Sequence, residues 1–135
     1  MADQLTLDII LPAAPQTVYE AWLDSFEHTA FTGGEAEIDS SIGGQFSAWD
    51  EYITGKTLEL EPFSRIVQSW RTTEFPENAA DSKLEILLAS VPQGTQLTVN
   101  HTEIPEGHGK QYDQGWKDFY FVPMLKYFKE LLAED

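Results

Sequence analysis

Residues 108–132 form the one long stretch of helical spacing in the chain, and they lie near its end. The apolar residues on one face of this stretch are Trp116, Tyr120, Met124, Tyr127 and Leu131, with Phe119 at the edge. Pro123 is expected to kink the helix, because it lacks a backbone N–H and crowds the preceding turn. A helix of this kind must bury its apolar stripe against another layer, which the rest of the chain has to supply.

The rest of the chain is predicted to be mostly β-strand. Alternation and turn residues predict a first strand over 5–11, short helices from Pro15 and over about 25–30, and strands over 35–39, 45–49, 56–61, 65–73, 83–90 and 95–103. The segment Val91-Pro92-Gln93-Gly94 between the last two strands is a hairpin signal. Consecutive strands joined by loops this short pair antiparallel.

These elements predict a single α+β domain over residues 1–135. One helix can cover a sheet of about six or seven antiparallel strands only if the sheet curves around it. We therefore expect a curved sheet around a long C-terminal helix, with two short helices after the first strand. A ligand-sized cavity is expected between the sheet and the C-terminal helix.

The chain is strongly acidic, with a formal net charge of −15 from 23 acidic and 8 basic residues. Such a charge repels phosphate backbones and anionic membrane surfaces, so we expect no nucleic-acid partner. No run approaches the roughly 18 apolar residues of a membrane span, and no signal peptide is recognised before the first strand. The chain has no cysteine, which fits a reducing compartment, and we expect a cytoplasmic protein.

Aromatic residues make up 13% of the chain and include four tryptophans. Large rings in a small domain either pack against one another or line a pocket. We predict a cavity lined by Trp22, Phe46, Trp70, His101, Tyr112, Trp116, Tyr120 and Met124. The hydroxyl groups of Tyr112 and Tyr120 would supply the few polar contacts that orient a ligand in an apolar pocket.

His101 is the titratable residue of most interest. It shares a strand face with Leu97 and Val99, so its imidazole points to the covered side of the sheet. There it either reaches a ligand as an acid, a base or a donor, or it is a core histidine satisfied by protein groups. In an earlier strand, alternation favours Trp70 toward the helix and Arg71 toward solvent; in the reverse register Arg71 would be a buried cation suited to a carboxylate ligand.

The sequence contains no motif for metal binding or catalysis. Its histidines, His28, His101 and His108, lie in different elements without metal-ligand spacing. There is no GxSxG elbow, P-loop or GxGxxG fingerprint. We therefore predict no metal site, no cofactor and no catalytic residue. If the cavity belongs to an enzyme, His101 and Tyr120 are the acid–base candidates.

Six segments occur in an order that resembles a known family. They are Ala30-Phe31-Thr32-Gly33, Gly43-Gly44-Gln45-Phe46, Gly55 with Leu60-Glu61-Pro62, Arg65-Ile66-Val67 with Trp70-Arg71, Gly94-Thr95-Gln96-Leu97-Thr98-Val99 with His101, and Gln114-Gly115-Trp116. Together they resemble the C-terminal domain of the activator of the heat-shock protein 90 ATPase. That family belongs to the START-like, birch-pollen-allergen-like (SRPBCC) superfamily, so the resemblance implies a helix-grip fold over nearly the whole chain.

The function implied by the resemblance is broader, because this superfamily includes lipid carriers, hormone receptors, polyketide cyclases and resistance proteins. The eukaryotic co-chaperone also has a separate N-terminal domain with an Asn- and Trp-rich motif, for which these 135 residues have no room. We expect non-catalytic binding of a small hydrophobic or amphipathic molecule in the cavity. The alternatives are a chaperone-associated interaction module of the stress response, and a cavity enzyme of cyclase or hydrolase type.

Overall fold

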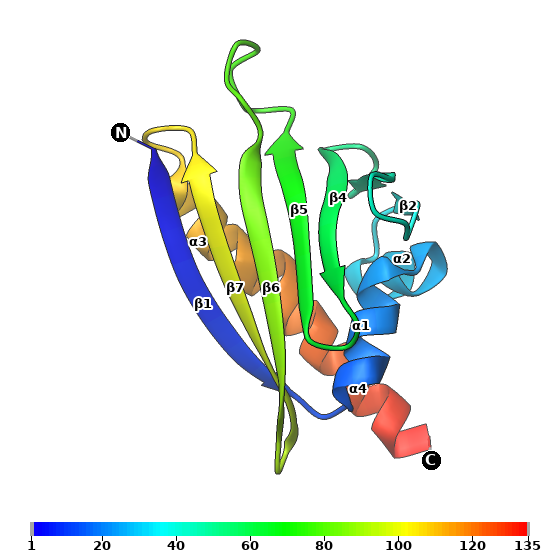
Figure 1. The fold of residues 1–135 in the computed structure, drawn as a ribbon. Helices are drawn as coiled ribbons and strands as arrows, with labels where there is room; N and C mark the ends of the chain where they lie inside the picture. The colour runs from blue at the N-terminus through cyan, green and yellow to red at the C-terminus, as the bar shows by residue number, and fades with distance from the viewer. Residues whose placement is uncertain (1, 135) are drawn as a thin grey trace.

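The structure is a computed structural model that describes residues 2–134 (Figure 1). Its elements in chain order are β1 (Asp3–Leu11), α1 (Pro15–Leu23), α2 (Ser25–Thr32), β2 (Glu37–Ile38), β3 (Gln45–Ala48), β4 (Ile53–Glu61), β5 (Arg65–Thr72), β6 (Ser82–Val91), β7 (Gly94–Ile104), α3 (Gly109–Trp116), the π-helical turn η1 (Lys117–Phe121) and α4 (Val122–Glu134). The element order therefore agrees with the order predicted from the sequence.

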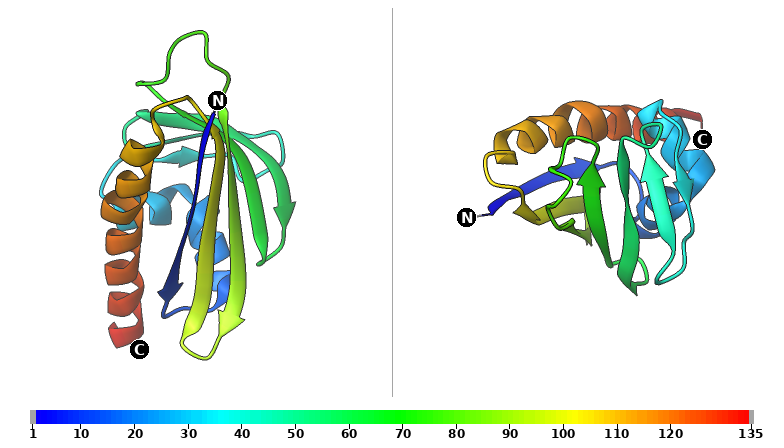
Figure 2. Two further views of the ribbon diagram at one scale, coloured as in Figure 1. Left: turned by 90° about the vertical axis from the view of Figure 1, so that its left-hand side faces the viewer. Right: turned by 90° about the horizontal axis from the view of Figure 1, so that it is seen from above.

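The seven strands form one antiparallel sheet in the order β1-β7-β6-β5-β4-β3-β2. Helices α1 and α2 carry the chain from β1 at one edge to β2 at the other. The sheet is curved, and the long helical segment α3–η1–α4 runs along its concave side, as Figure 2 shows. The α+β helix-grip architecture expected from the sequence is confirmed.

Strand β4 bends where the sheet wraps around the helix. Its pairing with β5 shifts register between Thr57 and Glu59, and a bulge of this kind increases local twist. Gly55 lets the two strands approach closely, because a Cβ there would lie 1.9 Å from the carbonyl oxygen of Ser69. A glycine in this strand is thus required by the close backbone approach.

Several predicted strands differ in extent from the observed ones. The strand expected over 35–39 is reduced to the two residues of β2, and the strand expected over 45–49 ends at Ala48. Trp49 leaves the sheet because its backbone has a left-handed φ of 53°. Strand β4 begins at Ile53, earlier than the predicted start at 56.

Alternation along the strands separates core from solvent as predicted. In β7, Leu97, Val99 and His101 are buried on the helix side of the sheet. In β5, Trp70 is buried on the same side, with only 4% of its surface exposed. The register predicted from the apolar pattern is therefore correct for both strands.

Arg71 lies on the opposite face of β5 from Trp70, but it is less exposed than predicted. Only 28% of its side chain is exposed. Its guanidinium donates to Asp81 Oδ1 at 2.8 Å and to the carbonyl of Ala79 at 3.0 Å. The loop after β5 folds back over the arginine, which the alternation pattern could not show.

One continuous helical segment runs from Gly109 to Glu134, as predicted, but it is not α-helical throughout. In the π-helical turn η1, the N–H of Val122 donates to the carbonyl of Lys117. Pro123 follows directly and has no N–H to give, so the wider turn lies where an α-helical bond would be lost. The irregularity expected at Pro123 thus occurs in the turn before it. Within residues 2–134, no helix is long and apolar enough to cross a membrane.

The π-helical turn shifts the buried stripe of the helix by one residue. The fully or nearly fully buried positions are Tyr112, Trp116, Tyr120, Phe121, Met124 and Phe128. Tyr120 and Phe121 are adjacent and both buried, which a regular α-helix with one narrow stripe does not produce. Phe128 is completely buried, whereas Tyr127, which the sequence placed in the stripe, is half-buried and donates its hydroxyl to Glu27 Oε1 at 3.0 Å.

Candidate functional site

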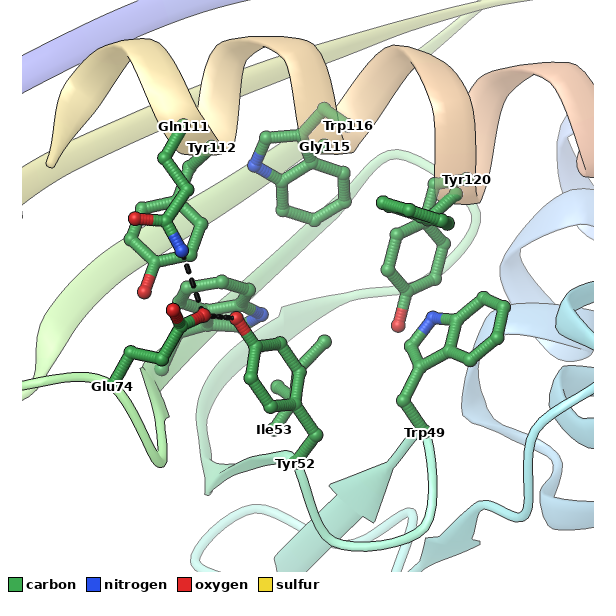
Figure 3. Close-up of a pocket in the computed structure, with 11 residues that line it drawn as sticks. Trp49, Tyr52, Ile53, Glu74, Gln111, Tyr112, Gly115, Trp116 and Tyr120 are labelled. Atoms are coloured by element: carbon green, nitrogen blue, oxygen red, sulfur yellow. Dashed lines mark hydrogen bonds between the residues drawn. The ribbon is translucent and has the colours of Figure 1, made fainter.

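A cleft of about 510 Å³ lies between the first half of the long helical segment and the sheet (Figure 3). Its helix side is formed by Gln111, Tyr112, Gly115, Trp116, Phe119 and Tyr120. These side chains lie together because helical neighbours recur every three and four residues. A cleft of ligand size between sheet and helix, as expected from the sequence, is present.

The sheet side of the cleft is formed by Trp49, Tyr52, Ile53 and Trp70. Trp49 and Tyr52 come from the turn between β3 and β4, in which Trp49, Asp50 and Glu51 have φ values of 53°, 56° and 71°. Each non-glycine residue in this left-handed region costs about 1–3 kcal/mol and persists only where the surroundings enforce it. Such strain concentrates at functional sites, so the turn supports a functional role for the cleft.

A bridge of three hydrogen-bonded side chains crosses the mouth of the cleft. Glu74 Oε2, in the loop after β5, accepts a hydrogen bond from the Tyr52 hydroxyl and another from Gln111 Nε2 at 2.7 Å (Figure 3). Burial is the largest cause that raises the pKa of Tyr52, and the hydrogen bond to Glu74 is the next. The hydroxyl of Tyr52 therefore remains neutral and acts as a donor. The bridge connects the β3–β4 turn, the β5–β6 loop and α3.

Three further polar groups lie beside the cleft. The hydroxyls of Tyr112 and Thr72 are hydrogen-bonded at 2.6 Å. Trp49 Nε1 is buried and has no hydrogen-bond partner among residues 2–134. An unpaired buried donor costs about 1–3 kcal/mol. A ligand atom that accepted a hydrogen bond from this indole would therefore remove a penalty that the protein alone leaves in place.

His101 is a core histidine and does not line the cleft. Its Nδ1 accepts from Trp116 Nε1 at 3.1 Å, because an indole nitrogen can only donate. Its Nε2 therefore carries the proton and donates to Ser82 Oγ at 2.8 Å, which in turn donates to the carbonyl of Trp70 at 2.7 Å. Burial lowers the pKa of His101 to about 3. Of the two alternatives for this residue, the satisfied core histidine is the one observed.

Tyr120 lines the cleft with its ring, while its hydroxyl is occupied elsewhere. The hydroxyl donates to His28 Nε2 at 2.9 Å, because His28 Nδ1 must carry the proton that it donates to the Trp22 carbonyl, also at 2.9 Å. Burial raises the pKa of Tyr120. The two acid–base candidates, His101 and Tyr120, thus use their polar atoms on other protein groups.

Four of the eight predicted cavity residues line this cleft: Trp70, Tyr112, Trp116 and Tyr120. The other four are buried but lie outside the lining: Trp22, Phe46, His101 and Met124. Trp22 packs behind the cleft, with its ring 5.1 Å from that of Tyr120, and donates to Gln68 Oε1 at 3.2 Å. Whether any of the eight binds a ligand stays a prediction.

The polar mouth of the cleft and one of its walls were not predicted from the sequence. Gly115 could have been found, because it lies three residues after Tyr112 and four before Phe119, and Gln111 lies four residues before Gly115. Trp49, Tyr52 and Glu74 could not, because they follow strand ends in turns that carry no glycine or proline signal at those positions. Among residues 2–134, no group of three or more His, Asp and Glu side chains could hold a metal ion.

A curved antiparallel sheet that grips a C-terminal helix and leaves an aromatic cleft defines a helix-grip domain of the START-like class. The family model described as "Activator of Hsp90 ATPase homolog 1-like protein" matches residues 12–129. The chain therefore belongs to this family, as the resemblance of its sequence segments predicted.

Two curated relatives carry names of the same kind. The chain is 25% identical over 104 residues to the activator of 90 kDa heat shock protein ATPase homolog of Dictyostelium discoideum, covering 77% of this chain and 27% of that protein. It is 25% identical over 105 residues to homolog 2 of Mus musculus, covering 78% of this chain and 31% of that protein. The chain thus spans less than a third of either relative.

A solved structure has the same fold. The crystal structure of an Hsp90 activator from Plasmodium falciparum matches with a TM-score of 0.76 at 23% identity. The match covers 98% of this chain and 96% of that one. At this identity the likeness shows a shared fold alone.

Proposed function

We propose that this domain binds a small apolar or amphipathic molecule, without chemical turnover, in the cleft between the helical segment α3–η1 and strands β4 and β5. The observation that carries the proposal is the cleft itself. Its volume of about 510 Å³ lies within the roughly 300–1,000 Å³ of small-molecule sites, and seven of its eleven lining residues are aromatic. A mostly apolar pocket with a few polar groups at its mouth is the usual form of such a site.

Binding is favoured over catalysis by the hydrogen bonds of the acid–base candidates. His101 and Tyr120 both use their polar atoms on buried protein groups, and a general acid or base must reach the proton that it transfers. The remaining polar groups of the cleft, Trp49 Nε1 and the bridge at Glu74, are suited to orienting a ligand.

Gly115 offers the sharpest test, because it lines the cleft and has no side chain. A Cβ there would meet no non-neighbouring atom closer than Phe119 Cδ2 at 4.0 Å. We expect the unmodified chain to bind a neutral environment-sensitive dye such as phenylnaphthylamine at micromolar levels, on the order of −8 kcal/mol. Gly115→Met should place a long side chain in the cleft and weaken binding by at least about tenfold, whereas Gly115→Ala should keep the affinity within about twofold.

Dye fluorescence measures the binding, and circular dichroism of each variant checks that the fold is kept. Both substitutions remove a glycine from a helix, so neither is expected to unfold the domain. Saturable binding that Gly115→Met leaves unchanged would place the dye on the outer surface and contradict the proposal.

A second function is favoured by the family. Relatives that share the family are named as activators of a 90-kDa chaperone's ATPase, and we propose that this domain also contacts a chaperone of that class through its surface. Sedimentation of the purified chain with the chaperone tests this. Complex formation that Gly115→Met does not alter would show a contact separate from the cleft, and no complex at tens of micromolar would refute the contact.

A further inference from the structure

The cleft has one charged lining residue, Glu74, and no lysine, arginine or histidine among the eleven residues that line it. We propose that the cleft selects cationic ligands: an aromatic or alkyl body that carries a protonated or quaternary amine, with the cation held between Glu74 and the rings at the mouth. This inference rests on the ligand-binding function proposed above and specifies the chemical class of that ligand.

The carboxylate of Glu74 is held in place and still has an acceptor to offer. Oε2 accepts hydrogen bonds from Tyr52 and Gln111, whereas Oε1 accepts none from residues 2–134. None of the ion pairs formed within the described part of the chain includes Glu74. Arg71 is close to Glu74 in sequence, but it forms an ion pair with Asp81 at 2.8 Å on the other face of β5. A ligand cation would therefore meet a preoriented carboxylate with no competing protein cation.

The neighbouring rings are the second element of a cation site. Figure 3 shows the Glu74 carboxylate next to the side chains of Tyr52 and Tyr112 at one end of the cleft. Burial is the main cause of the raised pKa of both tyrosines, and the charge of Glu74 also contributes to it. The negative potential of Glu74 therefore reaches both tyrosine side chains. Faces of tryptophan and tyrosine attract cations, and amine-recognition sites commonly combine such rings with an acidic group.

The charge of the whole chain acts in the same direction. A net charge of −15 concentrates cations near the protein and repels anions. A carboxylate-bearing ligand such as a fatty acid would find no basic side chain in the lining and would face Glu74 instead. A neutral ligand would gain affinity only from its contacts with the aromatic rings.

Three molecules with one apolar body separate these cases: naphthylethylammonium, naphthylethanol and naphthylacetate. Titration calorimetry on the full chain should give the ammonium a Kd about tenfold lower than the alcohol, and the acetate the highest Kd of the three. The preference should shrink with added salt, because the screening length falls from about 10 Å at 0.1 M to about 3 Å at 1 M.

Glu74→Gln removes the charge and keeps the length of the side chain and an acceptor for Tyr52. In this variant the Kd of the ammonium should lie within about twofold of the Kd of the alcohol, so the comparison of the two ligands is made within the same protein. Glu77→Gln is the matched control, because Glu77 is an exposed residue of the same loop that does not line the cleft. It should keep the full preference.

Equal affinities for ammonium and alcohol in the unmodified chain would overturn the cation selectivity and leave the proposed function standing. Loss of the preference in Glu77→Gln as well as in Glu74→Gln would also overturn it, because a general field and not Glu74 would then be responsible. Failure of all three molecules to bind would overturn the proposed function together with this inference.

Discussion

His28 and His101 are buried in the core, and this burial keeps both imidazoles neutral. Each donates one ring proton to a protein oxygen and accepts a hydrogen bond at the other nitrogen, from Tyr120 and Trp116 respectively. Burial lowers the pKa of His28 to about 4, against a smaller opposing effect of the Trp22 carbonyl, and that of His101 to about 3. Protonating either one would add a charge in the core and break one of these bonds.

These pKa values predict a loss of stability in mild acid. Below pH 6.5 an unfolded histidine binds a proton, whereas the native residue stays neutral until its own lower pKa is reached. The unfolded state therefore binds more protons, and each histidine lowers the free energy of unfolding by up to about 1.4 kcal/mol per pH unit. This loss runs from pH 6.5 down to about 4 for His28 and about 3 for His101.

Denaturant unfolding of the parent chain and of His101→Gln between pH 6.5 and 5 measures the effect. Carboxylates titrate in both proteins, so the difference between the two slopes isolates the histidine. The variant should show the shallower slope by up to about 1.4 kcal/mol per pH unit. Parallel slopes would mean that native His101 binds a proton as readily as the unfolded residue does.

Trp70 is a cleft residue whose truncation should greatly lower the stability of the domain. It is 4% exposed, and its ring lies 4.6 Å from that of His101 and 5.1 Å from that of Tyr112. Trp70→Ala should lower the free energy of unfolding by about 3–5 kcal/mol. Trp49→Ala should cost less, because Trp49 is only half-buried. A loss below about 1 kcal/mol for Trp70→Ala would contradict the packing described above.

At the scale of elements, the turn between β3 and β4 places Trp49 and Tyr52 at the cleft. Glu51 is exposed and has a φ of 71°, a conformation that glycine adopts without steric cost. Glu51→Gly should therefore stabilise the domain by about 0.5–1 kcal/mol, and Glu51→Val should destabilise it by at least as much. Thermal unfolding compares them, and equal melting temperatures would show that the turn carries no strain at this position.

The same turn shows where prediction from sequence fails. Strands and helices were predictable because their apolar residues recur with periods of two and about 3.6 along the chain. The wall of the cleft at Trp49 and Tyr52 was not predictable, because the backbone conformation of this turn depends on tertiary contacts. One of them is the hydrogen bond from the Glu35 N–H to Asp50 Oδ1 at 3.0 Å. Glu74 was also missed, because its partners Tyr52 and Gln111 are distant in sequence.

The π-helical turn explains a second failure of the sequence pattern. A regular helix would put Tyr127 in the buried stripe, but the extra residue of η1 turns Phe128 into the core. The predicted positions Trp116, Tyr120 and Met124 are buried, and the prediction first departs from the structure at Tyr127, which is half-buried. A single irregular turn therefore limits how far helical periodicity can be extended along this helix.

Across the whole molecule, the two halves of the long helical segment contact the rest of the chain differently. The α4 half closes the core through Met124 and Phe128, which are almost completely buried. The α3–η1 half leaves the aromatic cleft between itself and the sheet. One helix thus stabilises the fold at one end and forms a candidate binding site at the other.

The indole N–H resonances of the four tryptophans test the central claim most directly. Trp49 Nε1 lies unpaired beside the cleft, whereas Trp22 Nε1 lies behind it, bonded to Gln68. Adding naphthylethanol to the isotope-labelled chain should shift the Trp49 resonance most and the Trp22 resonance least, with saturation at a common micromolar Kd. A saturable shift at Trp22 without one at Trp49, or no shift at any indole, would contradict a ligand site in the cleft.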